Sequence, residues 1–497
     1  MAESWVNSAE RIGADLHLEL ELELSGKGGR RAALIRALRE AVRSGRLAPG
    51  TRLPPYRSLA ADLGMARNTV ADAYAELVAE GWLTARQGSG TRVAMGLSPT
   101  PLRQWGSAEP LQRAARVPKK APPRVRGPRH DLRQGTPDVS AFPRTAWIAS
   151  YRRALQQAPN EAFGPGDPAG RRELREALTE YLARARGVRT EPSRIVICSG
   201  FAHALRLVFG GSGGGVLKGP LAVEAYGLPF HRELLVAAGV RTLPLPLDED
   251  GAQVEELGKE RAVLLTPAHQ FPTGGPLHPS RRAAVIDWAR ARGGVILEDD
   301  YDGEFRYDRK PVGAVQGLDP ERVVHIGSVS KSLSPALRLG WMVLPERYVD
   351  AVLEAKGERE AWVSVLDQLT LADFIVSGAY DRHVRRMRQR YRTRRDRLVV
   401  ALAAQAPHIE VTGIAAGLHA VLRLPPGSEQ AAVRAAHWQG LALDGLAEFR
   451  HPEAAVPAPV GPDGPGGPDG LVVGYATPPE HAYGAALEAL CAALPPG

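Results

Sequence analysis

Cysteine is nearly absent from this chain of 497 residues, which contains only Cys198 and Cys491. Such sparse use argues against a disulfide framework or a cysteine-rich metal site, and it fits a reducing cytoplasm. The sequence also has no uninterrupted apolar run long enough to cross a bilayer. Its N-terminus carries acidic residues and lacks the apolar core of a signal peptide. We therefore expect a cytoplasmic protein with no membrane partner.

The first part of the chain lacks the acidic residues that would balance its positive charge. Residues 1–133 hold 22 Lys and Arg against 13 Asp and Glu, and the whole chain carries a formal charge of +8, so the remainder is close to neutral. A polyanion partner is therefore expected at the N-terminal part. The composition, with 44% hydrophobic and 24% charged residues, is that of a globular protein, and the length predicts two or more folding units.

The N-terminal patterns change from period two to the period of a helix. Residues 16–24 alternate apolar and acidic side chains, which predicts a short strand or an extended arm. Apolar stripes then predict helices over Arg30–Ser44, Arg57–Leu63 and Arg67–Glu80, followed by two short strands around the turn "RQGSG". This is the order of a winged helix-turn-helix, whose second paired helix enters the major groove by its N-terminal end.

That N-terminal end reads "GMARNTV", and its polar side chains suit base edges and phosphates. The opposite stripe of the same helix, with Val70, Ala73, Leu77 and Val78, is expected to face the core, as is Tyr74. The stretch from "RLPPYRSLAADLG" to "RQGSGTRV" resembles the GntR-type winged-helix DNA-binding domain along its whole length. In that family many members have Ser or Thr where this chain has Ala66. The DNA contacts that the resemblance implies are Arg57, Arg67, Asn68, Thr69, Gln87 and Gly88.

A stretch without periodicity follows the winged helix. Residues 95–133 hold seven prolines and nine basic residues against two acidic ones, which is typical of a linker. We therefore divide the chain into a DNA-binding domain with an N-terminal arm at residues 1–94, a basic proline-rich linker at 95–133, and a C-terminal domain at 134–497.

From about Gln134 the chain repeats a strand, a loop and a helix, which predicts a mainly parallel sheet covered by helices. In open α/β sheets ligands collect at the carboxyl ends of the strands, so the residues that follow each apolar run are candidates for a site. These are Ser199, Gly200 and Phe201 at a helix start, Asp299 and Tyr301 after "VILE", Ser328, Ser330, Lys331 and Arg338 after "VVHIG", and the loop "PAHQFPTGG", which holds His269.

The chemistry of these candidates divides between a phosphate and a reactive ring. The amides of a helix start, two serines and Arg338 could hold one phosphate, because charge-assisted hydrogen bonds are strong. A carboxylate, a phenol and a lysine remain. Pyridoxal 5′-phosphate (PLP) needs this set, since its aldehyde takes a lysine amine as a Schiff base, its pyridine nitrogen needs an acidic partner and its phenolic oxygen needs a donor. A lone lysine beside serines would be an ordinary surface lysine; the ordered set of strand ends favours a cofactor site.

The C-terminal domain resembles the fold-type I aminotransferases, and within them the aminotransferase-like half of the MocR/GabR regulators, through the blocks "TPAHQFPTG", "EDDYDGEFRY" and "GSVSKSLSPALRLGWMVLP". The resemblance implies an α/β fold with a large, mainly parallel sheet and a smaller C-terminal α+β subdomain. It implies that Lys331 forms the Schiff base, that Asp299 partners the pyridine nitrogen, and that Tyr301 donates to the phenolic oxygen. The phosphate ligands that it implies are Arg338, Ser199, Gly200, Phe201, Ser328 and Ser330.

Three positions depart from the pattern of these relatives. The subfamily's "EDPGY" block appears here as "VEAYGLPF", so Tyr226, the candidate to stack on the cofactor ring, is displaced along the chain. His269 lies in the loop where ordinary aminotransferases usually show an Asn-Pro motif, and we include it among the cofactor-binding candidates. Near the C-terminus, "DGLVVGYA" has apolar residues where aminotransferases commonly place an arginine for the substrate carboxylate, and Arg450 is a possible substitute.

Two classes of function fit these observations. The first is a transcriptional regulator that binds double-stranded DNA, carries PLP on Lys331 and senses an amino compound or PLP itself. The second is an active PLP-dependent aminotransferase with an appended DNA-binding domain, because every residue needed to hold the cofactor covalently is present. The complete winged helix and the missing carboxylate arginine favour the regulator. A regulator that has lost its cofactor is disfavoured by the intact lysine, aspartate, tyrosine and arginine. The resemblance also implies a homodimer, with one chain's DNA-binding head on the other's large domain.

Overall fold

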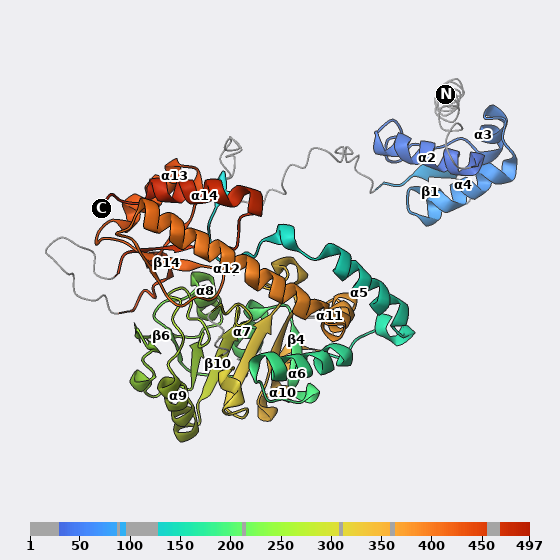
Figure 1. Cartoon of the computed structure of the whole chain (residues 1–497). Helices are drawn as coiled ribbons and strands as arrows, with labels where there is room; N and C mark the ends of the chain where they lie inside the picture. Colours follow the sequence, from blue (N-terminus) through green and yellow to red (C-terminus); the bar gives the residue numbers. More distant parts are fainter. Residues whose placement is uncertain are drawn as a thin grey trace. The chain divides into compact units, whose positions relative to one another are not determined.

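The computed structural model describes residues 29–86, 90–95, 128–210, 215–307, 312–357, 363–454 and 468–497. The chain divides into two compact units, residues 1–122 and 123–497, and each is described by itself (Figure 1). The expected strand or arm at residues 16–24 and most of the linker lie outside the described residues.

The N-terminal unit has the order of elements that the sequence predicts. It contains α2 (Arg30–Arg43), α3 (Tyr56–Asp62), α4 (Arg67–Ala79), and an antiparallel hairpin of β1 (Leu83–Arg86) and β2 (Gly90–Val93). The bounds of each of the three helices lie within one residue of those predicted. Each helix has an apolar stripe that packs in the core, and the stripes stop before Gly45, Gly64 and Gly81, respectively, so the apolar pattern marks where each helix ends.

Tyr74 lies in this core, as expected, and its hydroxyl donates a hydrogen bond to the Pro54 carbonyl at 3.0 Å. Val70, Ala73 and Leu77 are also buried, whereas Val78 is only partly buried at the edge of the core. The polar face at the start of α4 is therefore left to solvent, because the other face of the helix anchors it.

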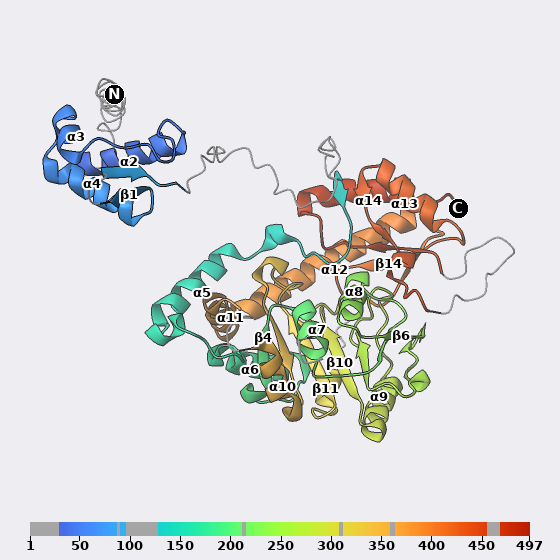
Figure 2. The ribbon, with the colours of Figure 1, turned by 180° about the vertical axis from the view of Figure 1, so that it is seen from behind.

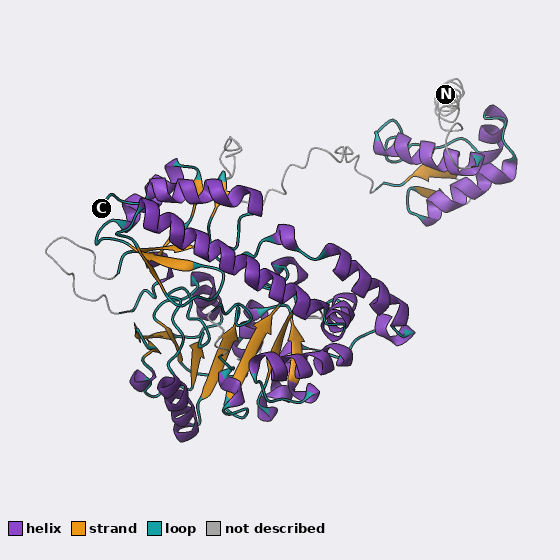
Figure 3. Cartoon of the chain, viewed as in Figure 1, coloured by secondary structure: helices purple, strands orange, loops and turns teal. Residues whose placement is uncertain are grey.

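The large unit is built on a sheet with helices around it (Figure 3). This sheet has seven strands in the order β4-β12-β11-β10-β9-β5-β6. Only β12 runs antiparallel to its neighbours, so the sheet is mainly parallel, as predicted. The strands are β4 (Ile195–Cys198), β5 (Leu221–Glu224), β6 (Thr242–Leu245), β9 (Ala262–Leu265), β10 (Val295–Asp300), β11 (Val323–Ser328) and β12 (Gly340–Val343).

Both faces of this sheet are buried. In β4, Ile195 and Ile197 pack into one core cluster while Val196 and Cys198 pack into another, as a strand covered on both sides requires. Side chains of α7, α8 and α10 pack in the second cluster, and those of α6 and α11 in the first. The helices are α5 (Arg144–Gln157), α6 (Arg172–Arg186), α7 (Phe201–Phe209), α8 (Pro229–Ala237), α9 (Pro279–Arg292), α10 (Glu346–Lys356) and α11 (Val365–Val376).

A smaller α+β subdomain follows the long helix α12 (Ala379–Gln405), again as predicted (Figure 2). Its antiparallel sheet has the order β13-β14-β17-β16. Its elements are β13 (Glu410–Thr412), β14 (Ala420–Arg423), α13 (Glu429–Trp438), β15 (Leu441–Ala442), β16 (Asp444–Gly445), β17 (Gly470–Val473) and α14 (Glu480–Ala493).

The large unit takes in residues that we had assigned to the linker. β3 (His130–Asp131) pairs in parallel with β15, and Leu132 is fully buried in the subdomain core. Structure in this unit therefore begins before residue 134. The sequence did not predict this start, because a two-residue strand in a basic, proline-rich stretch has no detectable periodicity.

Candidate functional site

The first candidate site is the N-terminal end of α4. Arg67 and Asn68 are exposed and Thr69 is half-buried. Ala66 occupies the N-cap position and has no side-chain oxygen to accept from the first-turn amides, so this helix start presents amide donors and one cation together. Arg57 is exposed near the start of α3. Gln87 and Gly88 lie outside the described residues.

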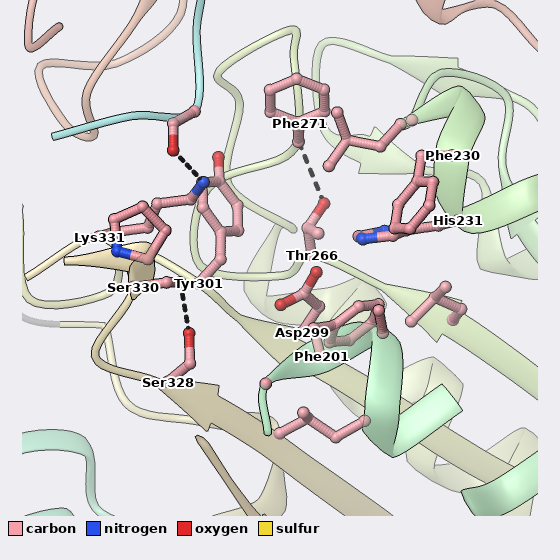
Figure 4. Close-up of a pocket in the computed structure, with 18 of the residues that line it drawn as sticks. Phe201, Phe230, His231, Thr266, Phe271, Asp299, Tyr301, Ser328, Ser330 and Lys331 are labelled. Atoms are coloured by element: carbon pink, nitrogen blue, oxygen red, sulfur yellow. Dashed lines mark hydrogen bonds between the residues drawn. The ribbon is translucent and has the colours of Figure 1, made fainter. Parts of the chain in front are cut away.

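The second candidate site is a cavity of about 260 Å³ in the large unit (Figure 4). It lies where β4, β5, β9, β10 and β11 reach their carboxyl ends, which is the edge that a parallel sheet offers to a ligand. All but one of the cofactor-binding candidates line it. They are Ser199, Gly200, Phe201, Tyr226, Asp299, Tyr301, Ser328, Ser330, Lys331 and Arg338.

One end of the cavity carries the groups suited to a phosphate. Gly200 is the N-cap of α7 and has φ 97° and ψ −179°, a conformation that only glycine adopts readily. The hydroxyls of Ser328 and Ser330 lie 2.7 Å apart. Arg338, itself left-handed at φ 52°, donates a hydrogen bond to the Ser199 carbonyl. A helix start, two hydroxyls and a guanidinium thus share one wall.

Lys331, in the turn after β11, and Asp299, near the end of the neighbouring strand β10, face the same cavity. The Lys331 ammonium donates a hydrogen bond to the Gly135 carbonyl, and burial lowers the pKa of this lysine although Asp299 and Asp302 oppose the shift. Burial raises the pKa of Asp299 well above its usual range. Its carboxyl group points into the cavity (Figure 4), and no hydrogen bond to it is formed within the described part of the chain. This carboxyl therefore offers its oxygens to a ligand.

Tyr301 follows β10 directly and also lines the cavity. Its hydroxyl lies 3.0 Å from Nδ1 of His269 and 3.1 Å from the His269 carbonyl. His269 itself does not line the cavity: its side chain is 3% exposed and lies behind Tyr301, with Nδ1 2.8 Å from Asp302 Oδ2. The structure thus puts His269 one contact away from the cavity.

Sequence reasoning missed Glu224, which also lines the cavity. Its carboxylate accepts hydrogen bonds from the amide and hydroxyl of Thr266, at 3.2 and 2.5 Å, and burial raises its pKa to about 7. Glu224 is the last residue of β5, so the same rule of strand ends would have found it.

Two histidines and an arginine of the wall were missed as well. Burial lowers the pKa of His231 to about 4 and that of His419 to about 3, so both are neutral. The Arg232 guanidinium donates to the carbonyls of Gly227 at 2.7 Å and Phe449 at 3.1 Å. Nothing local in the sequence marks these residues, since α8 and β14 reach the cavity only through the fold. Arg450, the possible substitute for the carboxylate arginine, lines a second cavity beside Tyr226.

Comparison with known proteins agrees with this division into two units. Residues 31–93 match the family model described as bacterial regulatory proteins, gntR family. Residues 131–450 match the model of aminotransferase class I and II. The fold of the large unit is similar to a kynurenine aminotransferase from Pyrococcus horikoshii, with a TM-score of 0.63 and 22% identity over 73% of this chain and 90% of that one. The chain thus joins a gntR-type helix-turn-helix to an aminotransferase-like domain.

Two curated relatives have the same span. The chain is 32% identical to the probable rhizopine catabolism regulatory protein MocR of Rhizobium meliloti, over 84% of this chain and 87% of that protein. It is 32% identical to the HTH-type pyridoxine biosynthesis transcriptional regulator PdxR of Corynebacterium glutamicum, over 78% of this chain and 82% of that protein. This chain belongs to the MocR-type family of HTH-type transcriptional regulators and is a DNA-binding regulator.

Within the described ranges, no helix has the length and apolar character needed to span a membrane. Nor does any group of three or more His, Cys, Asp or Glu side chains there form a potential metal site.

Proposed function

We propose that this regulator holds PLP in the cavity at the strand ends and that an amino compound, or PLP itself, changes its binding to DNA. When bound, PLP would supply an aldehyde that reacts with primary amines. The observation that carries the proposal is the set of groups that line one cavity: the Lys331 amine, the phosphate wall and the Asp299 carboxyl, to which no described residue donates a hydrogen bond. The second reading, an active aminotransferase, rests on the same residues and is tested below.

The residues of the cavity fit this group. Burial makes the Lys331 amine easier to deprotonate, and only the unprotonated amine can attack an aldehyde. Asp299 is half-buried on the cavity wall and forms no hydrogen bond with any residue that the structure describes, so a protonated ring nitrogen would give its carboxylate the partner that a charge in this low-dielectric site requires. The amides at the start of α7, Ser328, Ser330 and Arg338 would hold the phosphate.

Arg232 suggests what kind of amino compound the cavity accepts. Within the described residues its guanidinium hydrogen-bonds only to main-chain carbonyls, those of Gly227, Phe449 and Arg450. Carbonyls hold the side chain in place but do not neutralise its charge. If Arg338 serves the phosphate, Arg232 is the cation of the wall that remains for a carboxylate. We therefore favour an amino acid over a simple amine as the effector.

An effector can change DNA binding only if its affinity differs between two conformational states of the protein. A ligand shifts a conformational equilibrium only if it binds the DNA-competent and the incompetent state differently. We propose that an amino compound in the cavity would leave the Lys331 side chain free, and that the changed position of this side chain would favour one state of a homodimer.

The test combines spectroscopy, turnover and DNA protection on the full-length protein. Absorption spectra are recorded with PLP and a panel of amino acids paired with their decarboxylated amines. Transamination of the same panel is measured, and the region upstream of the protein's own gene is footprinted. We expect a protected site, a spectral response that is stronger for amino acids than for amines, and little turnover. Rapid transamination without a protected site would overturn the proposal in favour of the enzyme.

Gly200→Ala is expected to weaken PLP binding by about 5- to 150-fold, because a side chain in this backbone conformation costs about 1–3 kcal/mol. Relief of that strain would turn the start of α7 away from the phosphate wall. The measurement is a PLP titration of the apoprotein followed by visible absorbance. Gly239→Ala is the matched control, since Gly239 is also left-handed, at φ 75°, and does not line the cavity. Equal losses in both variants would contradict a role of Gly200 in phosphate binding.

A further inference from the structure

A buried histidine and aspartate lie directly behind the tyrosine of the cavity. His269 Nδ1 is 2.8 Å from Asp302 Oδ2 and 3.0 Å from the Tyr301 hydroxyl. The side chains of His269 and Asp302 are 3% and 1% exposed, and neither lines the cavity, whereas Tyr301 does. A histidine–carboxylate pair with so little contact with water acts on a ligand only through its neighbours. The His269 ring packs against His419 of the cavity wall with ring centroids 5.2 Å apart, and the cavity residue within hydrogen-bond distance of His269 is Tyr301.

The proton positions in this cluster follow from what each group can donate. A carboxylate only accepts, so Nδ1 of His269 carries the hydrogen that lies between it and Asp302. Nδ1 therefore cannot accept a hydrogen bond from Tyr301. The phenol oxygen instead accepts a share of the same N–H. The phenol hydrogen is left for an acceptor: the His269 carbonyl at 3.1 Å, the Asp302 carboxylate beside it, or an oxygen inside the cavity. The pair thus directs Tyr301 as a donor.

The surroundings hold the pair in place. A Cβ on Gly417 would lie 2.2 Å from His269 Cε1 and 2.7 Å from Asp302 Oδ2, so the glycine backbone packs directly on both side chains. The Gly417 carbonyl in turn accepts hydrogen bonds from the hydroxyls of Tyr307 and Tyr475. Rotation of His269 would require this whole wall to move.

The neighbouring loop residue cannot replace Tyr301 as a donor. Phe271, which precedes Pro272, lines the cavity with an apolar ring that meets the Tyr301 ring edge-on at 6.1 Å. The hydrogen bond to a phenolic oxygen bound on this side of the cavity therefore depends on the Tyr301 hydroxyl, and its direction depends on His269.

We propose that His269 and Asp302 are positioning residues that orient the Tyr301 hydroxyl toward the phenolic oxygen of the bound cofactor. This inference rests on the proposed function, because it requires PLP in the cavity. It gives His269 a role through Tyr301 in place of the direct cofactor contact that the sequence suggested.

The effect is measurable as the pH midpoint of the visible absorption band of the PLP-bound protein. A hydrogen bond donated to the phenolic oxygen favours the deprotonated form of the cofactor, so its loss raises the midpoint. The other titratable groups that face the cluster are kept constant in every variant. They are Asp299, Glu224, Lys331, His419, Tyr307 and Tyr475.

We expect His269→Leu to raise this midpoint by about one pH unit, which corresponds to the free energy of about one hydrogen bond to a charged group. Tyr301→Phe should raise the midpoint by at least as much. In the Tyr301→Phe background, His269→Leu should add almost nothing, because its effect passes through the phenol. His269→Asn, whose amide can donate from the place of Nδ1, should restore most of the wild-type midpoint. His325→Gln is the matched control, because His325 is an equally buried histidine beside a carboxylate, Glu298, and does not line the cavity.

Each outcome decides between distinct conclusions. An unchanged midpoint in His269→Leu, or additive shifts in the double variant, overturns the positioning role and leaves PLP binding intact. If thermal unfolding shows that His269→Leu does not fold, Asp302→Asn, which keeps the shape of the pair, replaces it in the test. A smaller upward shift of the midpoint then supports the positioning role, and no shift overturns it. A wild-type protein with no visible band at any PLP concentration would remove the proposed cofactor, and this role with it.

Discussion

Lys331→Ala is expected to abolish the visible absorption band that PLP gives with this protein, together with every spectral change caused by amino compounds. An alanine side chain has no amine, and no other lysine lines the cavity among the described residues. The loss should be complete, because a covalent bond either forms or does not. The measurement is the absorption spectrum of the purified variant with added PLP, before and after an amino acid is added.

Two further variants separate the covalent bond from charge and from nonspecific labelling. Lys331→Arg keeps a cation at the position but cannot react, since a guanidinium stays protonated, so it should also lack the band. Lys259→Ala removes an exposed lysine outside the cavity and should leave the band unchanged. A band of wild-type intensity in Lys331→Ala would mean that PLP reacts elsewhere.

The fold and most of the cavity follow from local patterns in the sequence. A parallel sheet brings the ends of its strands to one edge, so Asp299 near the end of β10 and Ser328 at the end of β11 had to be neighbours once those strands were identified. The winged helix was equally accessible, because the stripe of α4 that packs in the core leaves Arg67 and Asn68 on the other face.

What the sequence could not predict depends on contacts between distant segments. His419 comes from the start of β14, and the carbonyls that hold Arg232 come partly from Phe449 and Arg450. No periodicity or motif reports such approaches. His269 illustrates the same limit within a motif, since the loop was identified but the direction of its side chain is set by Asp302 and Gly417.

Substitutions in the large unit and in the DNA-binding unit can be tested separately, because the two are separate compact units. A change confined to the start of α4 should leave the cavity and its spectrum unaltered, whereas a change in the cavity should alter the response to the effector without removing the intrinsic affinity for DNA. Variants of the two units therefore test DNA binding and the chemistry of the cavity independently, and so distinguish a regulator from an enzyme.

Arg67→Ala is expected to abolish the footprint at the operator and to lower the affinity of the protein for the operator by about 5- to 150-fold, since the loss of an arginine contact to a base costs about 1–3 kcal/mol. The residue is exposed at the first position of α4, so its removal should change the free energy of unfolding by less than about 0.5 kcal/mol. The visible band with PLP should remain. The affinity is measured by titration of a labelled operator fragment at several salt concentrations.

The salt series distinguishes the two contacts that this arginine can make. Loss of a phosphate contact would weaken all DNA sequences alike and reduce the salt dependence by the equivalent of about one ion, whereas loss of a base contact would mainly reduce the preference for the operator. Arg46→Ala removes the same charge from the exposed turn after α2 and should retain the footprint. A footprint that survives Arg67→Ala, or a variant that loses its fold and its PLP band together, would show that Arg67 does not act at the DNA.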